Sequence, residues 1–288
     1  MIIVTNAGEP TPKKKTVDPK SQSLTGKSNI RSFYMLYEQT HQKLIAMKLF
    51  GLAAALKDRI ERRDHQDLSK TEFLGLLIDD EWLYRESRKL TARLKVAKFK
   101  LRAATIESID YSTPRGLRKD QVLELTQNRW LRAHESLLIT GPSGSGKSFV
   151  AQAFGQHACR SGFPVQYLRM PALLTLFVQA RAQGTYDRLI KRLSKIALLI
   201  IDDLGLATLT ETQKQDLLEA IEERYGTGAT IITSQLPVAD WHEYLGGGRI
   251  ADAILDRIIH NAHRIELASR DSMRKSYPDL LHAGQSDI

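Results

Sequence analysis

The spacing of hydrophobic positions changes along this chain. Between residues 33 and 107, apolar side chains recur at intervals of three and four, which places them on one face of a helix. They are Ile45, Leu49, Leu52, Leu56 and Ile60, followed by Leu76, Leu83, Leu90, Leu94 and Leu101. Ser69 and Glu72 have the spacing of a capping box, which predicts that a long helix begins there. We therefore expect an all-helical N-terminal domain over 33–110.

A second pattern begins after the turn-forming stretch "DYSTPRG" at 110–116, which predicts a linker. Short apolar runs then alternate with helical stretches. The runs are "SLLIT", "FPVQYLRM", "KIALLIIDDLG", "GATIITS" and "HRIELA", and we expect four helices between them, at 148–160, 171–182, 210–226 and 250–262. Such alternation predicts an α/β domain over 115–270, with a parallel five-stranded sheet covered by helices on both faces.

The two ends of the chain show neither pattern. Residues 1–32 are rich in Pro, Ser, Thr and Lys, which predicts a disordered tail, and 271–288 form a C-terminal tail. No apolar stretch has the length of a membrane span, the first residues do not resemble a signal peptide, and a single cysteine, Cys159, excludes an internal disulfide. We expect a cytoplasmic protein without a membrane partner.

The stretch "GPSGSGKS" follows the first predicted strand and precedes a predicted helix. It has the P-loop spacing, in which glycines let backbone amides face phosphate oxygens at a helix N-terminus. Lys147 can then reach the β- and γ-phosphates of ATP, and the Ser148 hydroxyl can ligate Mg²⁺. The alternative is a glycine-rich turn without a binding role, but such a turn would not be expected to lie between a buried strand and a helix. The expected nucleotide contacts are Gly141, Pro142, Ser143, Gly144, Ser145, Gly146, Lys147, Ser148 and Phe149.

Acidic and polar residues end two other predicted strands. Asp202 and Asp203 follow "ALLII", and a P-loop requires such a carboxylate. We expect Asp202 to hold Mg²⁺ through its water shell and Asp203 to polarise the attacking water. Thr233, Ser234 and Gln235 end the next strand, and they lie near the γ-phosphate if that strand lies between the other two. Ser234 is included among the nucleotide contacts, although plain strand-end polarity is the alternative.

Basic residues are concentrated in one segment. The chain has a net charge of +9, and eight of its cations lie between residues 85 and 102 with only Glu86 opposing them. They are Arg85, Arg88, Lys89, Arg93, Lys95, Lys98, Lys100 and Arg102. Like charges on a helix repel one another unless a polyanion neutralises them, so we expect contact with a nucleic-acid backbone. A solvated helix face is the alternative.

Arg257 lies in the late helical stretch "ADAILDRIIHNA". An arginine in such a place can reach into the ATP site of a neighbouring subunit and offset charge in the transition state. The alternative is an ion pair with Asp252 or Asp256.

The stretches "LLITGPSGSGKS", "LLIIDDLG", "ATIITSQLPVADWHEYLG" and "ADAILDRIIHNAHRIEL", with "YEQTHQKLIAMKLFGLAAALKDR" before them, resemble the IstB-type transposition helper ATPases, over roughly 35–277. These are AAA+ proteins related to the DnaC helicase loaders. The resemblance implies an ATPase that oligomerises on duplex DNA through ATP-bridged subunits and recruits the transposase of its insertion sequence. Lys147 and Ser148 would be Walker A, Asp202 and Asp203 Walker B, and Arg257 the finger.

The chain departs from the wider AAA+ pattern in two ways. Walker B ends in Asp-Asp rather than Asp-Glu, which predicts slow hydrolysis, and too few residues follow the last strand for the usual helical lid. Arg274 is a candidate second sensor. A helicase loader is the nearest alternative function, whereas a small-molecule P-loop kinase would leave the basic segment unexplained. A scaffold that binds ATP without hydrolysing it is the third.

Overall fold

The computed structural model describes residues 35–62, 68–268 and Met273. The tails predicted at 1–32 and 271–288 lie outside these residues, Met273 excepted, and so does Arg274. The chain divides into two compact units, Met1–Ser87 and Arg88–Ile288. Within the described ranges, no helix has the length and apolar character needed to cross a bilayer.

The first unit is helical, as its sequence pattern predicts. It contains a helix over 35–46, helix α2 (Phe50–Arg62) and the beginning of helix α3 (Lys70–Ala97). The pattern predicts one helix through 45–60, but the chain turns at Lys48, whose φ of 61° ends the first helix. The predicted capping box is confirmed: Ser69 N donates to Glu72 Oε2 at 2.8 Å, and Glu72 N donates to Ser69 Oγ at 3.3 Å.

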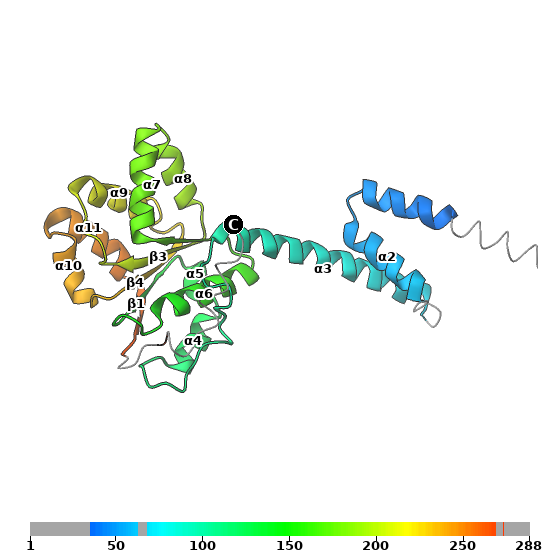
Figure 1. The fold of residues 1–288 in the computed structure, drawn as a ribbon, viewed down its shortest axis with the longest axis horizontal. Helices are drawn as coiled ribbons and strands as arrows, with labels where there is room; N and C mark the ends of the chain where they lie inside the picture. The colour runs from blue at the N-terminus through cyan, green and yellow to red at the C-terminus, as the bar shows by residue number, and fades with distance from the viewer. Residues whose placement is uncertain (1–34, 63–67, 269–272, 274–288) are drawn as a thin grey trace, which may run out of the picture. The chain divides into compact units, whose positions relative to one another are not determined.

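The second unit is built on a parallel sheet in the order β2-β3-β4-β1-β5 (Figure 1). Its strands are β1 (Ser136–Thr140), β2 (Val165–Arg169), β3 (Leu198–Leu204), β4 (Ala229–Ser234) and β5 (Ala262–Glu266). Every neighbouring pair is parallel, which confirms the predicted five-stranded sheet. Strand β4 lies between β3 and β1, so the carboxyl ends of β1, β3 and β4, where the predicted site residues lie, are neighbours at one edge of the sheet.

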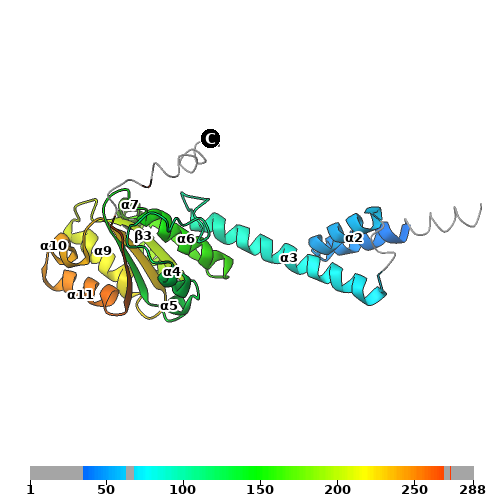
Figure 2. The same cartoon turned by 90° about the horizontal axis from the view of Figure 1, so that it is seen from below.

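Helices cover both faces of this sheet (Figures 1 and 2). One layer contains α4 (Lys119–Leu125), α5 (Arg129–Arg132) and α6 (Lys147–Arg160). The other contains α7 (Met170–Ala182), α8 (Tyr186–Ser194), α9 (Glu211–Glu222), the short η1 (Val238–Asp240), α10 (Trp241–Tyr244) and α11 (Gly248–Ile259). Strand side chains alternate between the layers: Leu137 and Ile139 belong to the first core, and Leu138 belongs to the second.

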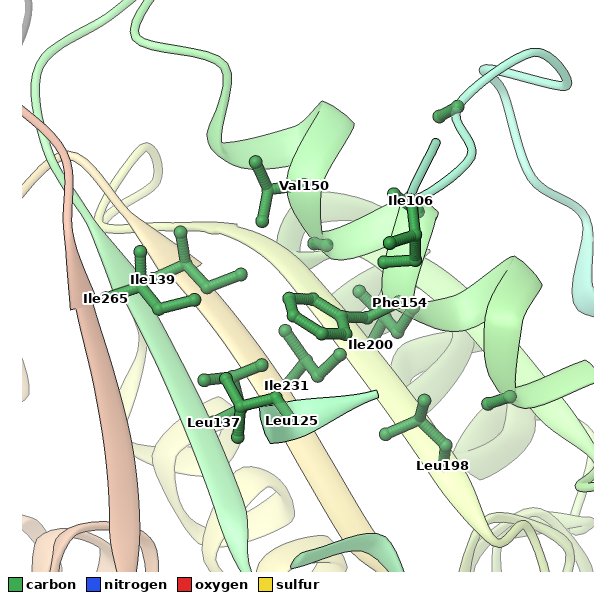
Figure 3. Packing of buried hydrophobic residues seen from close by; sticks show 14 of the residues in the cluster. Ile106, Leu125, Leu137, Ile139, Val150, Phe154, Leu198, Ile200, Ile231 and Ile265 are labelled. Carbon is green, nitrogen blue, oxygen red and sulfur yellow. The ribbon is translucent and has the colours of Figure 1, made fainter. Parts of the chain in front are cut away.

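The first core fixes helix α6 to the sheet (Figure 3). Phe154 of α6 is 2% exposed and packs in the same cluster as Leu137 and Ile200 of the sheet. Burying one such aromatic side chain contributes about 1.5–3 kcal/mol. Because α6 begins at Lys147, this packing also holds the P-loop in place.

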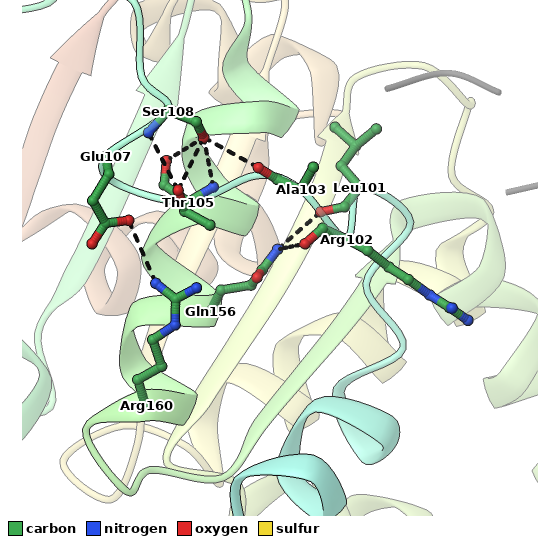
Figure 4. A network of polar contacts seen from close by, with 8 residues as sticks. All are labelled: Leu101, Arg102, Ala103, Thr105, Glu107, Ser108, Gln156 and Arg160. Carbon is green, nitrogen blue, oxygen red and sulfur yellow. Dashed lines mark hydrogen bonds and ion pairs between the residues drawn. The ribbon is translucent and has the colours of Figure 1, made fainter. Parts of the chain in front are cut away.

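The segment between α3 and α4 belongs to the sheet unit, although the sequence pattern predicts a domain boundary at 110–115. Ala97, Ala104 and Ile106 are buried in the first core. Gln156 of α6 donates from Nε2 to the carbonyl oxygens of Leu101 at 2.9 Å and Arg102 at 3.0 Å (Figure 4). These contacts tie the segment to α6, and the compact-unit boundary accordingly falls earlier, after Ser87.

The linker predicted at 110–116 is instead part of the packed structure. Arg115 is 2% exposed, and its guanidinium donates to Ser145 O and to Asp110 O, each at 2.9 Å. Asp110 accepts from Ser112 and Thr113, and these hydrogen bonds lower the pKa of its carboxyl to about 2. The turn at 110–116 therefore packs against the P-loop through Arg115 and is not a flexible linker.

Candidate nucleotide-binding site

The loop from Gly141 to Gly146 connects β1 to α6 and has the backbone of a phosphate-binding turn. Gly141, Gly144 and Gly146 have φ values of 145°, 83° and 93°. A Cβ at Gly141 would collide with the Leu267 carbonyl, and one at Gly146 would collide with the Arg115 guanidinium. Only glycine fits both places, so the predicted turn is the one that the chain forms.

Two polar groups of this loop suit an anionic ligand. Lys147 is 6% exposed, and its ammonium donates to Gly141 O at 2.7 Å and to Pro142 O at 2.8 Å, which holds it against the loop. The Ser145 hydroxyl is buried and has no hydrogen-bond partner among the described residues, so it is available to a phosphate oxygen. Phe149, by contrast, packs in the first core.

Ser148 and Asp202 meet across the site as a P-loop ATPase requires. Ser148 Oγ donates to Asp202 Oδ1 at 2.9 Å, which leaves the serine oxygen free to bind a cation. Within the described part of the chain, no cluster of three or more acidic, His or Cys side chains could hold a metal. The donor set of one hydroxyl and one carboxylate suits Mg²⁺ that arrives with a nucleotide, because Mg²⁺ binds through few carboxylates together with phosphates and water.

Asp202 is held by hydrogen bonds from two further strands. Its side chain is buried, the Tyr167 hydroxyl donates to Oδ2 at 2.6 Å, and the Thr233 hydroxyl donates to Oδ1. Burial, reinforced by the charge of Asp202, raises the pKa of Tyr167, so its phenol stays a neutral donor. These bonds fix the carboxylate before any ligand binds.

Asp203 reaches the same edge through an irregular backbone. Its φ is 67°, and the pairing of β3 with β4 shifts register between Ile201 and Leu204. In a regular strand Asp203 would point to the face opposite Asp202, and the bulge turns it back. Its backbone N–H donates to Thr233 Oγ1 at 3.0 Å, so one threonine binds both aspartates.

An arginine that the sequence pattern did not single out binds Asp203. Arg169 ends β2, and its Nε and Nη2 lie 2.8 and 2.7 Å from Asp203 Oδ2. This hydrogen-bonded contact raises the pKa of Arg169. The register of β2 against β3 pairs Arg169 with Asp202, the neighbour of Asp203. Arg169 therefore comes close to Asp203 through strand pairing, which local sequence spacing does not reveal.

The other two polar residues at the end of β4, Ser234 and Gln235, do not bind the aspartate pair. Ser234 Oγ donates to Leu204 O at 2.7 Å and accepts from Leu236 N at 3.0 Å, so its hydroxyl is engaged in the turn. Gln235 is exposed. Of the three predicted sensor candidates, Thr233 lies closest to the chemistry, whereas the nucleotide contact of Ser234 stays a prediction.

Arg257 lies at the opposite edge of the sheet from the P-loop. Arg257 lies in the last turn of α11, shortly before β5 begins at Ala262, and Ala262 is paired with Ser136 at the beginning of β1. The P-loop instead follows the end of β1. Five strand residues separate the two edges by about 17 Å. Arg257 Nη2 lies 2.7 Å from Glu222 Oε1, and Nη1 donates to Ala253 O at 2.9 Å. Its ion-pair partner is thus Glu222, and neither Asp252 nor Asp256.

The basic segment at 85–102 is not one helical face. Helix α3 ends at Ala97, and Lys98 follows with a φ of 57°. Arg85 pairs with Glu81 at 2.6 Å, and Arg93 donates to Cys159 O at 3.0 Å. Glu81 lies one turn before the run, so the expectation of an unopposed charge at Arg85 was wrong. Of the eight cations, only Arg93 is half-buried; the other seven are exposed, and the later ones among them are Lys95, Lys98, Lys100 and Arg102.

A second group of cations lies on α8, a helix that the sequence pattern missed. Arg188, Lys191 and Arg192 of α8, with Lys195 directly after it, are exposed and line a hollow of about 960 Å³ beside Gln179 of α7. The acidic Asp187 of α8 lines the same hollow. Their spacing of three and four puts them on one face of the helix. No ion pair involving them is found in the described part of the chain. The apolar residues Leu189, Ile190 and Leu193 of "YDRLIKRLS" would have revealed this helix.

The sheet order, the P-loop and the aspartate pair define a P-loop ATPase of the AAA+ class. A structure with the same fold is AMPPCP-bound DnaA from Aquifex aeolicus, which is 19% identical with a TM-score of 0.52 over 63% of this chain and 57% of that one. The family model for IstB-like ATP binding proteins matches residues 42–278, and the chain belongs to that family.

Two relatives illustrate the family. An insertion-sequence ATP-binding protein of Sinorhizobium fredii is 47% identical over 84% of this chain and 98% of its own length. The ATP-binding protein of insertion sequence IS1162 from Pseudomonas fluorescens is 39% identical over 70% of this chain and 88% of its own. The family model, over residues 42–278, extends into the N-terminal helical unit as well as over the ATPase core.

Proposed function

We propose that the chain is an ATP-driven regulator of DNA insertion, which assembles on duplex DNA and brings a transposase to the target. The observation that carries this proposal is the set of exposed cations on the unit that contains the ATP site. Those of α8 in particular form no ion pair among the described residues, although Asp187 lines the same hollow. An ATPase with a small-molecule substrate has no need of such a surface.

The chemistry at the ATP site is assigned to four side chains. Lys147 would neutralise charge on the β- and γ-phosphates, and Ser148 and Asp202 would hold Mg²⁺. When bound there, the ion would supply neutralisation of phosphate charge. Asp203 accepts a hydrogen bond from the attacking water through Oδ1, because Oδ2 is bound by Arg169. Aspartate is shorter than glutamate, so we expect slow turnover.

Subunit assembly is assigned to Arg257. An arginine at the sheet edge opposite the P-loop cannot reach the nucleotide of its own subunit. It can reach the ATP of a neighbour packed against that edge, once it leaves Glu222. ATP at such a junction would be shared between two subunits, and this supports the proposal of a homo-oligomer bridged by nucleotide.

DNA contact is assigned to the backbone and not to the bases. Lysine and arginine without partners neutralise phosphates regardless of sequence. The cations of α8 and the exposed later cations of the 85–102 segment serve this purpose. The relatives are named for insertion sequences, and this supports a transposase of the same element as the protein partner.

Fluorescence anisotropy with duplex and single-stranded oligonucleotides, each with and without ATP, tests the proposal. We expect ATP-dependent binding that favours duplex and weakens steeply with salt, because each neutralised phosphate releases a counterion. A preference for single strands would favour a helicase loader. A flat salt response would contradict backbone contact.

A further inference from the structure

A buried arginine packs against the P-loop. Arg115 Nη1 donates to Ser145 O at 2.9 Å, and a Cβ at Gly146 would come within 2.4 Å of the same nitrogen. Gly146 is the N-cap of α6, so the guanidinium contacts the loop at the point where the helix begins. The four side chains assigned to the chemistry of ATP do not include Arg115, although it is buried beside the phosphate-binding backbone.

The surrounding turn holds Arg115 through both its side chain and its backbone. Arg115 Nη2 donates to Asp110 O at 2.9 Å, and Arg115 O accepts from Ala268 N, after β5, at 2.8 Å. The Asp110 carboxylate accepts from Ser112 Oγ and Thr113 Oγ1, each at 2.6 Å. These bonds fix Arg115 before any nucleotide binds, so the binding of a nucleotide does not have to order it.

The contact with Ser145 O sets the direction of the next backbone amide. The Ser145 carbonyl and the Gly146 N–H belong to one planar trans peptide, in which the two groups point in opposite directions. Because Arg115 binds the carbonyl, the Gly146 N–H points away from the guanidinium. Met273 N donates to the preceding carbonyl, Gly144 O, at 2.9 Å, so two successive peptides of the loop are held by groups outside it.

We propose that Arg115 is a positioning residue for the polyphosphate of the nucleotide. It keeps the Ser145 carbonyl turned out of the loop, so that the Gly146 N–H can donate to a β-phosphate oxygen. Backbone amides of a P-loop cradle the α- and β-phosphates, and a carbonyl that faced them would repel their charge. Without Arg115 the peptide between Ser145 and Gly146 can rotate, because glycine tolerates several backbone conformations.

The inference rests on the proposed nucleotide site, and it adds a residue outside the P-loop motif on which that site depends. The first test measures how much the β-phosphate adds to affinity, as the ratio of the Kd for AMP to the Kd for ADP in the full chain. Competition with a fluorescent ADP analogue gives both constants.

Arg115→Met keeps most of the side-chain length but removes its donors. It should lower the Kd ratio by roughly ten- to a hundredfold, the factor for one hydrogen bond to a charged group, while the Kd for AMP changes little. Arg115→Lys can still donate to one carbonyl, so its ratio should lie between those of the wild-type protein and Arg115→Met.

Arg118→Met is the matched control, because it removes a nearby cation that is exposed and pairs with Asp120. It should keep the wild-type Kd ratio. Thermal unfolding establishes that each variant folds. If Arg115→Met does not fold, Arg115→Lys provides the same comparison with a smaller expected change, and a wild-type ratio in that variant would overturn the inference.

Steady-state kinetics separates positioning from a general loss of structure. The Gly146 N–H would bind ATP in the ground state as well as in the transition state, so Arg115→Met should raise the KM for ATP more than it lowers kcat. A partly unfolded preparation would instead contain fewer active molecules, which lowers kcat at an unchanged KM. That second pattern would contradict the positioning role.

The outcomes separate this inference from the proposed function. A wild-type Kd ratio in folded Arg115→Met, or an equal loss of affinity for AMP and ADP, would overturn the inference and leave the nucleotide site standing. A wild-type protein that binds ADP no more tightly than AMP would overturn the proposed nucleotide site as well, because the P-loop would then contribute nothing to binding of the β-phosphate.

Discussion

Arg169 and Asp203 form an ion pair at the carboxyl edge of the sheet, with Nε and Nη2 of the arginine 2.8 and 2.7 Å from one carboxylate oxygen. The pair joins the ends of β2 and β3 beside the P-loop. It places a positive charge on the residue expected to polarise water, and it leaves only the other oxygen of Asp203 for that task.

Removing this arginine tests whether its ion pair with Asp203 slows ATP hydrolysis. Arg169→Gln should raise the ATPase rate without DNA by roughly three- to tenfold, the factor that corresponds to about 0.7–1.4 kcal/mol for a partly exposed pair. Steady-state turnover with saturating ATP measures it. A rate that falls instead would mean that Arg169 supports Asp203 or binds the nucleotide. Arg169→Lys retains the positive charge but not the planar guanidinium, so its ATPase rate should lie between the rates of the wild-type protein and Arg169→Gln.

Replacing the carboxylate itself tests hydrolysis against a scaffold role. Asp203→Asn should lower turnover by about 10²–10⁴-fold, the usual contribution of a general base, while ATP affinity changes little. Single-turnover hydrolysis and equilibrium binding of a fluorescent ATP analogue separate the two effects. Unchanged turnover would show that Asp203 has no part in hydrolysis.

Thr233 is expected to matter for stability as well as for the site. Thr233→Val keeps the volume but removes the hydroxyl that donates to Asp202 and accepts from Asp203 N. The buried Asp202 carboxylate and the N–H of the half-buried Asp203 then lose this partner, so the free energy of unfolding should fall by about 1–3 kcal/mol. Chemical denaturation measures it. Thr233→Ser retains the hydroxyl and should recover most of the stability, and equal destabilisation by both variants would argue against this account.

The α8 surface can be tested by its salt dependence. Replacing Arg188, Lys191, Arg192 and Lys195 with Gln should reduce the slope of log affinity against log salt by about one for each phosphate that is no longer neutralised. Anisotropy titrations at several salt concentrations give the slope. An unchanged slope would remove α8 from the proposed DNA-binding surface.

Much of the sheet and the P-loop could be predicted from the sequence, because buried parallel strands are continuous apolar runs and a phosphate loop has fixed glycines. All five strands were found in this way. Helix α8 was missed although its apolar spacing is present, because it is short and lies directly before the apolar run of β3.

The contacts around the aspartates could not be predicted in the same way. Arg169 and Tyr167 reach Asp203 and Asp202 only through the register of β2 on β3 and a bulge in β3, and neither is encoded in local spacing. The pairing of Arg85 with Glu81, by contrast, follows from a four-residue helical step and could have been predicted.

We propose that ATP is hydrolysed between subunits, with Asp203 supplied by one and Arg257 by its neighbour. Mixing Asp203→Asn protein with Arg257→Ala protein tests it most directly, in the presence of duplex DNA. Each variant alone should be nearly inactive, and the mixture should recover turnover, because some junctions combine an intact Asp203 with an intact Arg257. Turnover of the mixture equal to the average of the two separate variants would contradict the claim.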